Sequence, residues 1–301
     1  MSDPEITALR AIIAQRPRSD DIAQRRRDID ARGKQNKLAA DVTVEPASAN
    51  GVKAEWTATP DADRAKAVLY VHGGGYVIGS LDSHRHLVAE IGRAARAPAL
   101  ALDYRLAPEH PFPAAVEDVV FGYRFLLAKG IQPGGITIAG DSAGGGLVVA
   151  AMLAIRNAGL AQPACGWAIS PWVDMEATGG SMTTKAAADP TVQKAGILDM
   201  AKHYLGGADP RSPLAAPLYG DLTGLAPLLI QVGAAETLLD DAIRLAQVAG
   251  AADVAVDLQI WPEMIHVWHI YHSDLAAGRR AIEAGGRFAQ AMTSRGSRAG
   301  F

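Results

Sequence analysis

A five-residue turn motif, Gly-Asp-Ser-Ala-Gly at 140–144, constrains the fold of this chain more than any other stretch. It fits the pattern G-x-S-x-G and lies between a short strand-like run, 136–139, and a long apolar helical stretch, 147–155. A strand that turns directly into a helix strains the backbone of the central residue, and only small residues fit two positions before and after it. The pattern therefore predicts that Ser142 is exposed at the carboxyl edge of a sheet, beside the N–H groups that begin a helix.

The motif alone is weak evidence, since a chain with 31 glycines matches it by chance with a probability of roughly 0.1. Its context strengthens it, because strand-like runs and helical patterns alternate along most of the chain. The strand-like runs are 67–71, 99–103, 136–139, 165–169, 228–232 and 254–260, and the helical patterns are 83–96, 114–129, 143–158, 238–250 and 274–293. Such alternation predicts an α/β fold with a mostly parallel sheet that helices cover on both faces.

Residues 1–40 are expected to form an N-terminal helical arm. Pro17 divides the helical pattern in two, and the first part carries its apolar residues on one face: Ile6, Leu9, Ile12 and Ile13. The sequence leaves open whether this arm is part of a cap or simply packs against the rest of the protein.

Residues 41–301 are expected to form one catalytic domain, which begins with an antiparallel hairpin of the runs 42–44 and 52–57. One interval, 174–212, interrupts the alternation with glycines, a helical piece at 197–205 and two Asp-Pro pairs. An insertion between a strand and the next unit suits a cap over an active site, together with the arm. The alternative is a surface excursion with no role.

The composition fits a soluble globular protein and argues against several functional classes. Hydrophobic residues make up 49% of the chain and charged residues 20%, and the net charge of −3 gives no electrostatic case for binding nucleic acid or an anionic membrane. The basic run 25–27 has acidic neighbours and is expected to be a solvated helix face. The single cysteine, Cys165, excludes an intrachain disulfide, and its apolar surroundings predict a buried structural thiol. No stretch approaches the roughly 20 apolar residues of a membrane span, and no signal peptide is evident, so a cytoplasmic location is expected.

A second glycine-rich turn, His-Gly-Gly-Gly at 72–75, follows the strand-like run 67–71. Consecutive glycines let backbone N–H groups point at a ligand without obstruction by side chains, as an oxyanion hole requires. A phosphate-binding loop would need a downstream Gly-Lys-Ser/Thr, and the dinucleotide fingerprint would need glycine where Ile78 stands. A plain glycine turn remains the structural alternative.

A third stretch, 103–115, reads Asp-Tyr-Arg-Leu-Ala-Pro-Glu-His-Pro-Phe-Pro-Ala-Ala. Together with the two glycine motifs, and in this order, it resembles the hormone-sensitive-lipase-like branch of α/β-hydrolase esterases over about residues 40–301. The resemblance implies the α/β-hydrolase fold with a helical cap and the activity of a serine carboxylesterase. It also implies that the N–H groups of Gly74, Gly75 and Ala143 form the oxyanion hole.

The expected triad needs a histidine that follows both the serine and the acid in chain order. Of the eight histidines, His266, His269 and His272 follow the last strand-like run, and His266 comes soonest after it. The family has its catalytic histidine in a similar short loop, usually with Phe two residues later, where this chain has Trp268. We predict His266 as the base. A metal pair of His266 and His269 lacks the pattern of a third ligand, so no metal site is expected.

The triad acid is where the chain departs from the family pattern. The family loop usually reads Asp-Pro-Leu followed by Asp, whereas 233–241 reads Gly-Ala-Ala-Glu-Thr-Leu-Leu-Asp-Asp. Glu236 occupies the position of the triad aspartate, and a glutamate can also orient an imidazole. We predict Glu236 as the acid, with Asp240 as the alternative.

These residues predict a serine carboxylesterase that works through an acyl-enzyme and requires no metal or cofactor. The resemblance suggests small-molecule esters with short to medium acyl chains, and a homodimer through an edge strand. Met200 and Tyr204 in the insertion, with Trp268 beside the predicted base, could line the substrate pocket or equally belong to the core. An amidase or deacetylase with the same triad is the nearer alternative. A non-catalytic receptor on this fold is the more distant one, since such members typically lose the histidine.

Overall fold

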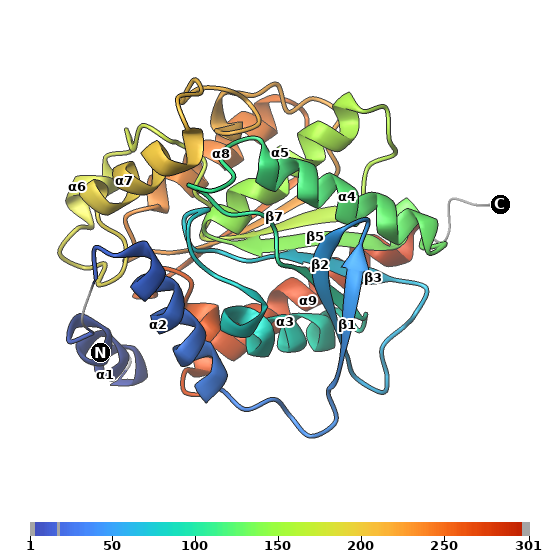
Figure 1. The fold of residues 1–301 in the computed structure, drawn as a ribbon, viewed down its shortest axis with the longest axis horizontal. Helices are drawn as coiled ribbons and strands as arrows, with labels where there is room; N and C mark the ends of the chain where they lie inside the picture. The colour runs from blue at the N-terminus through green and yellow to red at the C-terminus, as the bar shows by residue number, and fades with distance from the viewer. Residues whose placement is uncertain (1–3, 17–18, 297–301) are drawn as a thin grey trace.

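The computed structural model describes residues 4–16 and 19–296 (Figure 1). The centre of this part of the chain is a sheet of eight strands in the order β1-β2-β4-β3-β5-β6-β7-β8. The strands are β1 (Thr43–Ala49), β2 (Val52–Ala58), β3 (Ala67–Val71), β4 (Ala99–Leu102), β5 (Ile136–Asp141), β6 (Cys165–Ile169), β7 (Leu228–Gly233) and β8 (Val256–Trp261). β2 pairs antiparallel with β1 and β4, and all the other neighbours pair parallel, so the predicted mostly parallel sheet and its leading hairpin are confirmed.

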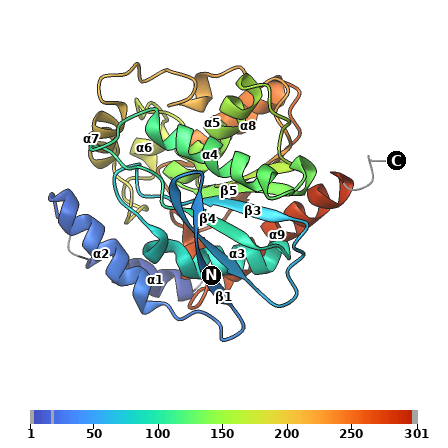
Figure 2. The same cartoon turned by 45° about the vertical axis from the view of Figure 1, so that its right-hand side comes forward.

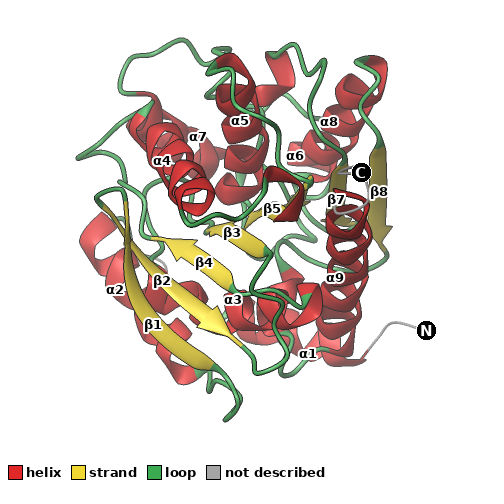
Figure 3. Cartoon of the chain, turned by 90° about the vertical axis from the view of Figure 1, so that its right-hand side faces the viewer, coloured by secondary structure: helices red, strands yellow, loops and turns green. Residues whose placement is uncertain are grey.

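Helices cover both faces of this sheet (Figure 3). α3 and α9 pack on one face, and α4, α5 and α8 pack on the other. The helices are α1 (Pro4–Ala14), α2 (Ile22–Gln35), α3 (Leu81–Ala95), α4 (Ala114–Ala128), α5 (Ala143–Asn157), α6 (Ser181–Thr184), α7 (Lys194–Leu205), α8 (Leu239–Ala251) and α9 (Ala276–Gly296). Short 3₁₀ turns lie at η1 (Pro133–Gly135), η2 (Pro217–Tyr219) and η3 (Trp268–Tyr271).

Strand β3 shows why the central strands are apolar along their whole length. Successive side chains of a strand point to opposite faces, and both faces of this sheet are covered. Leu69 and Val71 belong to the core under α4, α5 and α8, whereas Val68 and Tyr70 belong to the core under α3 and α9. An alternating polar pattern would place polar groups in one of these two cores.

The N-terminal arm forms two helices, as expected, with the expected breaker Pro17 lying outside the described residues. Ile6 and Ile13 are buried against the segment that follows β8 and against α9. Ile12, however, is 58% exposed, so the prediction that it shares the buried face is wrong. Ile6 and Ile13 are seven residues apart and lie on one side of the helix, while Ile12 is turned away from that side by about 100°.

Residues 174–212, which lie between β6 and β7 and which we call the insertion, carry α6 and α7. Both views place these helices at the same end of the molecule as α2 (Figures 1 and 2). The expected helical piece at 197–205 begins earlier than predicted, at Lys194. Strand β8 begins at Val256, two residues later than predicted.

Cys165 is fully buried, as predicted, and burial raises the pKa of its thiol to about 12. A thiol with so high a pKa is almost entirely protonated at neutral pH and is a poor nucleophile.

The parallel strands bring the candidate functional residues to one edge of the sheet. β3, β5, β7 and β8 all run in the same direction, so the loops that follow them leave from the same edge. These loops carry the glycine turn 72–75, Ser142, Glu236 and His266. In open α/β sheets this carboxyl edge is where ligands bind.

Candidate active site

Ser142 occupies the strained turn between β5 and α5. Its φ of 56° and ψ of −120° lie outside the regions that side-chain-bearing residues usually adopt. The flanking glycines allow this turn, because a Cβ on Gly140 would lie 2.6 Å from the carbonyl oxygen of Gly144. A Cβ on Gly144 would lie 2.1 Å from the carbonyl oxygen of Val71. The requirement for small residues, which the sequence motif predicts, therefore has a direct steric cause.

Three predicted catalytic side chains form one line of hydrogen bonds. His266 Nε2 lies 2.9 Å from Ser142 Oγ, and His266 Nδ1 lies 2.6 Å from Glu236 Oε2. The serine is partly exposed, whereas the Glu236 side chain is fully buried. A buried carboxylate on Nδ1 fixes the tautomer in which Nε2 carries no proton and faces the serine.

The second oxygen of Glu236 is held by groups that sequence reasoning missed. Glu236 Oε1 accepts hydrogen bonds from Ser170 Oγ at 2.9 Å and from the Gly233 N–H at 2.5 Å. Ser170 Oγ also accepts from the N–H of Val267, 3.1 Å away. Ser170 therefore joins the acid to the loop of the histidine. The available signal was its position directly after a buried strand, at the edge where the other site residues gather.

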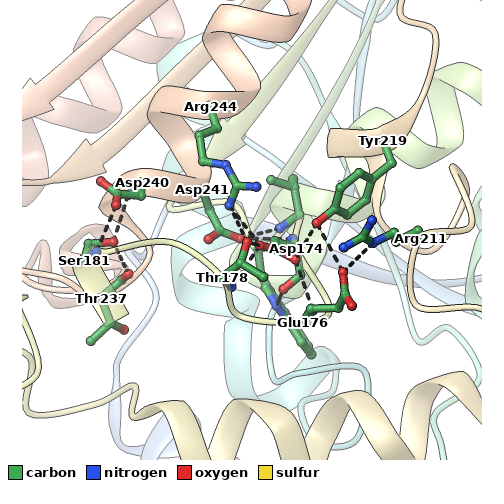
Figure 4. Close-up of polar contacts among 12 residues, drawn as sticks. Asp174, Glu176, Thr178, Ser181, Arg211, Tyr219, Thr237, Asp240, Asp241 and Arg244 are labelled. Atoms are coloured by element: carbon green, nitrogen blue, oxygen red, sulfur yellow. Dashed lines mark hydrogen bonds and ion pairs between the residues drawn. The ribbon is translucent and has the colours of Figure 1, made fainter. Parts of the chain in front are cut away.

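Asp240, the alternative acid, faces a different partner. Its Oδ2 accepts from the Ser181 N–H at 2.9 Å, and its own N–H donates to Ser181 Oγ at 3.0 Å (Figure 4). Of the two carboxylates that the sequence offers, the structure brings Glu236 to His266.

Burial and charge act in opposite directions on His266. Burial lowers its pKa, but the hydrogen bond to Glu236 and the charges of Glu236, Asp189 and Asp141 outweigh burial, and the pKa is raised above the usual value for histidine. A neighbouring carboxylate favours the imidazolium form. The site therefore stabilises the charged form that a general base acquires when it takes a proton.

The glycine turn lies next to Ser142 and is pinned by the neighbouring residue Asp141. Asp141 Oδ1 accepts from the Gly73 N–H at 3.1 Å and from Tyr70 Oη at 2.6 Å, and Oδ2 lies 3.4 Å from His84 Nε2. Burial alone would raise the pKa of Asp141, yet His84 and Tyr70 hold it at about 2. The carboxylate thus fastens the glycine turn to the strand that carries the serine.

Backbone N–H groups of Gly74, Gly75 and Ala143 are available beside the serine. Gly74 and Gly75 adopt φ values of 113° and 64°, which glycine tolerates far better than other residues. Ala143 is the first residue of α5, where N–H groups have no partner inside the helix. Within the described part of the chain, none of these three N–H groups donates to a protein atom.

The three tentative pocket residues lie in different surroundings. A Cβ on Gly75 would lie 2.0 Å from the sulfur of Met200, so this half-buried side chain covers the glycine turn. Tyr204 is buried, and its ring stacks on that of Tyr76 with centroids 3.7 Å apart. Trp268 is fully buried and packs with Ile6 in the core between α1 and α9, which is the core alternative that the sequence left open.

The basic run 25–27 is not entirely a solvated face. The Arg26 guanidinium donates to the carbonyl oxygens of Val77 and Ala107, at 2.8 and 2.9 Å, and forms a bidentate pair with Glu109. Helix α2 is therefore fastened to the segment that follows the glycine turn. The charge pattern did not predict this, because Glu109 is 83 positions away in the sequence.

His269 forms a buried hydrogen bond with a side chain of β7. Its Nε2 lies 3.0 Å from Gln231 Oε1, and burial lowers its pKa to about 3. Among the described residues, no group of three or more histidine, cysteine or acidic side chains could hold a metal ion. In the same residues, no helix is both long and apolar enough to cross a membrane.

Comparisons with known proteins agree with the fold described above. A family model described as the alpha/beta hydrolase fold matches residues 68–270. An acetyl-hydrolase of Streptomyces hygroscopicus is 53% identical over 243 residues, which cover 81% of each chain. An esterase of Acinetobacter venetianus is 31% identical over 252 residues, which cover 83% of each chain.

Solved structures resemble the chain over nearly its whole length. The crystal structure of an esterase from the bacterial hormone-sensitive lipase family is 48% identical and has a TM-score of 0.95, with 97% of this chain and 99% of that chain covered. The esterase EstE5, in crystals soaked with p-nitrophenyl butyrate, is 46% identical and has a TM-score of 0.94, with 97% and 100% covered. The chain therefore belongs to the α/β-hydrolase fold family and, within it, to the esterases related to hormone-sensitive lipase.

Proposed function

We propose that this protein is a serine carboxylesterase that hydrolyses small-molecule esters with short to medium acyl chains. The observation that carries the proposal is the line of hydrogen bonds from Ser142 through His266 to Glu236, beside three backbone N–H groups that donate to no protein atom among the described residues. Nucleophile, base, orienting acid and oxyanion donors are the four parts that acyl transfer by a serine requires.

The reaction proceeds in two steps through an acyl-enzyme. His266 Nε2 takes the proton of Ser142 Oγ as the oxygen attacks the ester carbonyl carbon. The N–H groups of Gly74, Gly75 and Ala143 stabilise the resulting oxyanion, and Glu236 stabilises the imidazolium. His266 then gives its proton to the departing alcohol. Water then repeats these steps. Its proton passes to His266 as its oxygen attacks the acyl carbon, and the proton returns to Ser142 as the carboxylic acid leaves.

The insertion and the N-terminal arm serve as a cap in this proposal. Met200 of the insertion covers Gly75, and Arg26 of the arm donates to the carbonyl oxygen of Val77, so the arm holds the segment that follows the proposed oxyanion loop. A small acyl group suits a site covered in this way. Two similar proteins, an acetyl-hydrolase and an esterase whose crystals were soaked with a butyrate ester, support the same size class.

A homodimer through an edge strand is a further part of the proposal. β8 is the last strand in the sheet order, and its Ile260 is 45% exposed. A strand at the edge of a sheet offers unpaired backbone groups to a second copy. Light scattering on the protein and on Ile260→Lys tests this; a monomer at all concentrations would contradict it.

Initial rates on p-nitrophenyl esters of increasing chain length, for the protein and for Ser142→Ala, test the proposed activity. Ser273→Ala, which changes an exposed serine, is the matched control. We expect the highest kcat/KM for short acyl chains and no hydrolysis above background by Ser142→Ala. Hydrolysis of matched amides but not of esters would instead identify an amidase. Activity that survives in Ser142→Ala would refute the proposed nucleophile.

A further inference from the structure

Thr237, the residue directly after Glu236, is held by the insertion on both sides of its backbone. Its N–H donates to Asp189 Oδ2 at 2.9 Å, and its carbonyl oxygen accepts from Ser181 Oγ at 2.6 Å. Figure 4 shows the second contact, with Ser181 between Thr237 and Asp240. The peptide group that follows the proposed triad acid is thus fixed by residues 48 and 56 positions away in the sequence.

Asp189 makes the most extensive of these contacts. It lies between α6 and α7 and is only 2% exposed. Its Oδ1 accepts from the N–H groups of Thr191 and Val192, at 2.8 and 3.0 Å, and its Oδ2 accepts from the N–H and the hydroxyl of Thr237. One carboxylate therefore defines the local shape of the insertion and holds the acid loop at the same time.

The Ser181–Asp240 contacts form a second connection next to the first. Asp240 Oδ2 accepts from the Ser181 N–H, and Ser181 Oγ accepts from the Asp240 N–H. The loop from Glu236 to Asp240 is consequently attached to the insertion at two points. A displacement of the insertion would be transmitted to the backbone of Glu236.

We propose that Asp189 is a positioning residue for hydrolysis: from the insertion, it fixes the backbone at Thr237 and thereby keeps the Glu236 carboxylate aligned with His266. This inference rests on the proposed role of Ser142, His266 and Glu236. It assigns to the insertion a part in the alignment of the catalytic groups, beyond covering them.

The charges around His266 give Asp189 an effect that a purely structural anchor would lack. The charged groups that act on His266 are Glu236, Asp189 and Asp141, and each of them raises its pKa. His266 must be neutral to act as a base, so kcat/KM falls when the pH drops below its pKa. Removing the Asp189 charge lowers the pKa of His266. The fall of kcat/KM at low pH, which we call the acid limb of the pH profile, then moves to lower pH.

The test compares Asp189→Ala and Asp189→Asn with the unmodified protein on p-nitrophenyl acetate. Asp199→Asn, which changes a largely exposed carboxylate on α7, is the matched control. We expect Asp189→Ala to lower kcat by ~10-fold or more with little change in KM, since small misplacements of catalytic groups cost up to about 100-fold. Asp189→Asn keeps one acceptor oxygen and should lose less kcat. Both variants should show the acid limb at lower pH, while Asp199→Asn should not.

Titration of active sites with a phosphonate inhibitor separates positioning from loss of folded protein. Because the folded fraction can itself vary with pH, the rate at each pH is divided by the concentration of active sites titrated at that pH. An unmoved acid limb, with all lost rate explained by missing active sites, would overturn the proposal; so would unchanged kcat in both variants. If Asp189→Ala does not fold, Asp189→Asn decides by the same criteria. Failure of the proposed function would instead appear as ester hydrolysis by Ser142→Ala.

Discussion

The buried carboxyl group of Asp241 should make the stability of this protein depend on pH. Asp241 is fully buried at the start of α8, and its Oδ2 accepts from the N–H groups of Val173 and Asp174 (Figure 4). Its Oδ1 has no hydrogen-bond partner within the described residues. Burial, with the charge of Asp174 as a further cause, raises its pKa from 3.8 to about 7, against the opposing effects of the two backbone N–H groups and of Arg244.

The sign and size of the effect follow from proton linkage. The unfolded chain releases the Asp241 proton near pH 4, whereas the folded protein keeps it until about pH 7. Between these values the folded state binds more protons, so its stability falls as the pH rises. A shift of about three pKa units at about 1.4 kcal/mol per unit corresponds to about 4 kcal/mol lost between pH 4 and pH 7.

The substitution Asp241→Asn isolates this contribution, because an amide does not titrate. Urea unfolding of both proteins, followed by tryptophan fluorescence at several pH values, gives the difference in unfolding free energy. The two proteins can differ in unfolding free energy already at low pH. As the pH rises from about 4 to above 7, we expect the unfolding free energy of Asp241→Asn to increase relative to that of the unmodified protein by up to about 4 kcal/mol. Asp240→Asn, with the adjacent and less buried carboxylate, is the control. A difference independent of pH would refute the reasoning.

Three further predictions concern catalysis. Glu236→Gln should lower kcat by ~10³–10⁴-fold, as loss of the orienting charge does in other triads, and Asp240→Asn should lower it far less; the reverse order in steady-state rates would assign the acid to Asp240. The pKa of His266 is raised, so as the pH is lowered kcat/KM for p-nitrophenyl acetate should reach half its plateau value at a pH above 6.5, the ordinary pKa of histidine. A midpoint below pH 6.5 would contradict the charge balance at His266. Gly75→Ala should reduce kcat by ~10²-fold or more, since the new Cβ would lie 2.0 Å from the sulfur of Met200 at a φ of +64°. Gly75→Ala in a Met200→Ala background should recover some activity, and no recovery would mean that backbone strain alone is responsible.

The sequence predicts well those features whose cause is local. The turn at Ser142 requires small neighbours within two residues, and that requirement is visible in the sequence. The mostly parallel sheet follows from the alternation of apolar strands and helical patterns, each readable over a short window. Because parallel strands end at one edge, the positions of Glu236 and His266 after β7 and β8 were enough to expect them near the serine.

Features that depend on distant partners were beyond such reasoning. Ser170 holds Glu236 across 66 positions, and Asp189 holds Thr237 across 48, with no pattern that links either pair in the sequence. Trp268 illustrates the same limit, since closeness to His266 along the chain left the pocket and the core equally open. Its ring packs with the N-terminal helix α1. The direction of a side chain after a tight turn depends on which distant element packs against it.

That contact between α1 and the far end of the chain bears on how the protein folds as it is synthesised. The buried residues Ile6 and Ile13 emerge from the ribosome early, yet the residues they pack against lie at 264–281. The helix must therefore wait, with its apolar face uncovered, until residues 264–281 have been made. Since a chain is synthesised at about 5–20 residues per second, this wait lasts at least ~10 s.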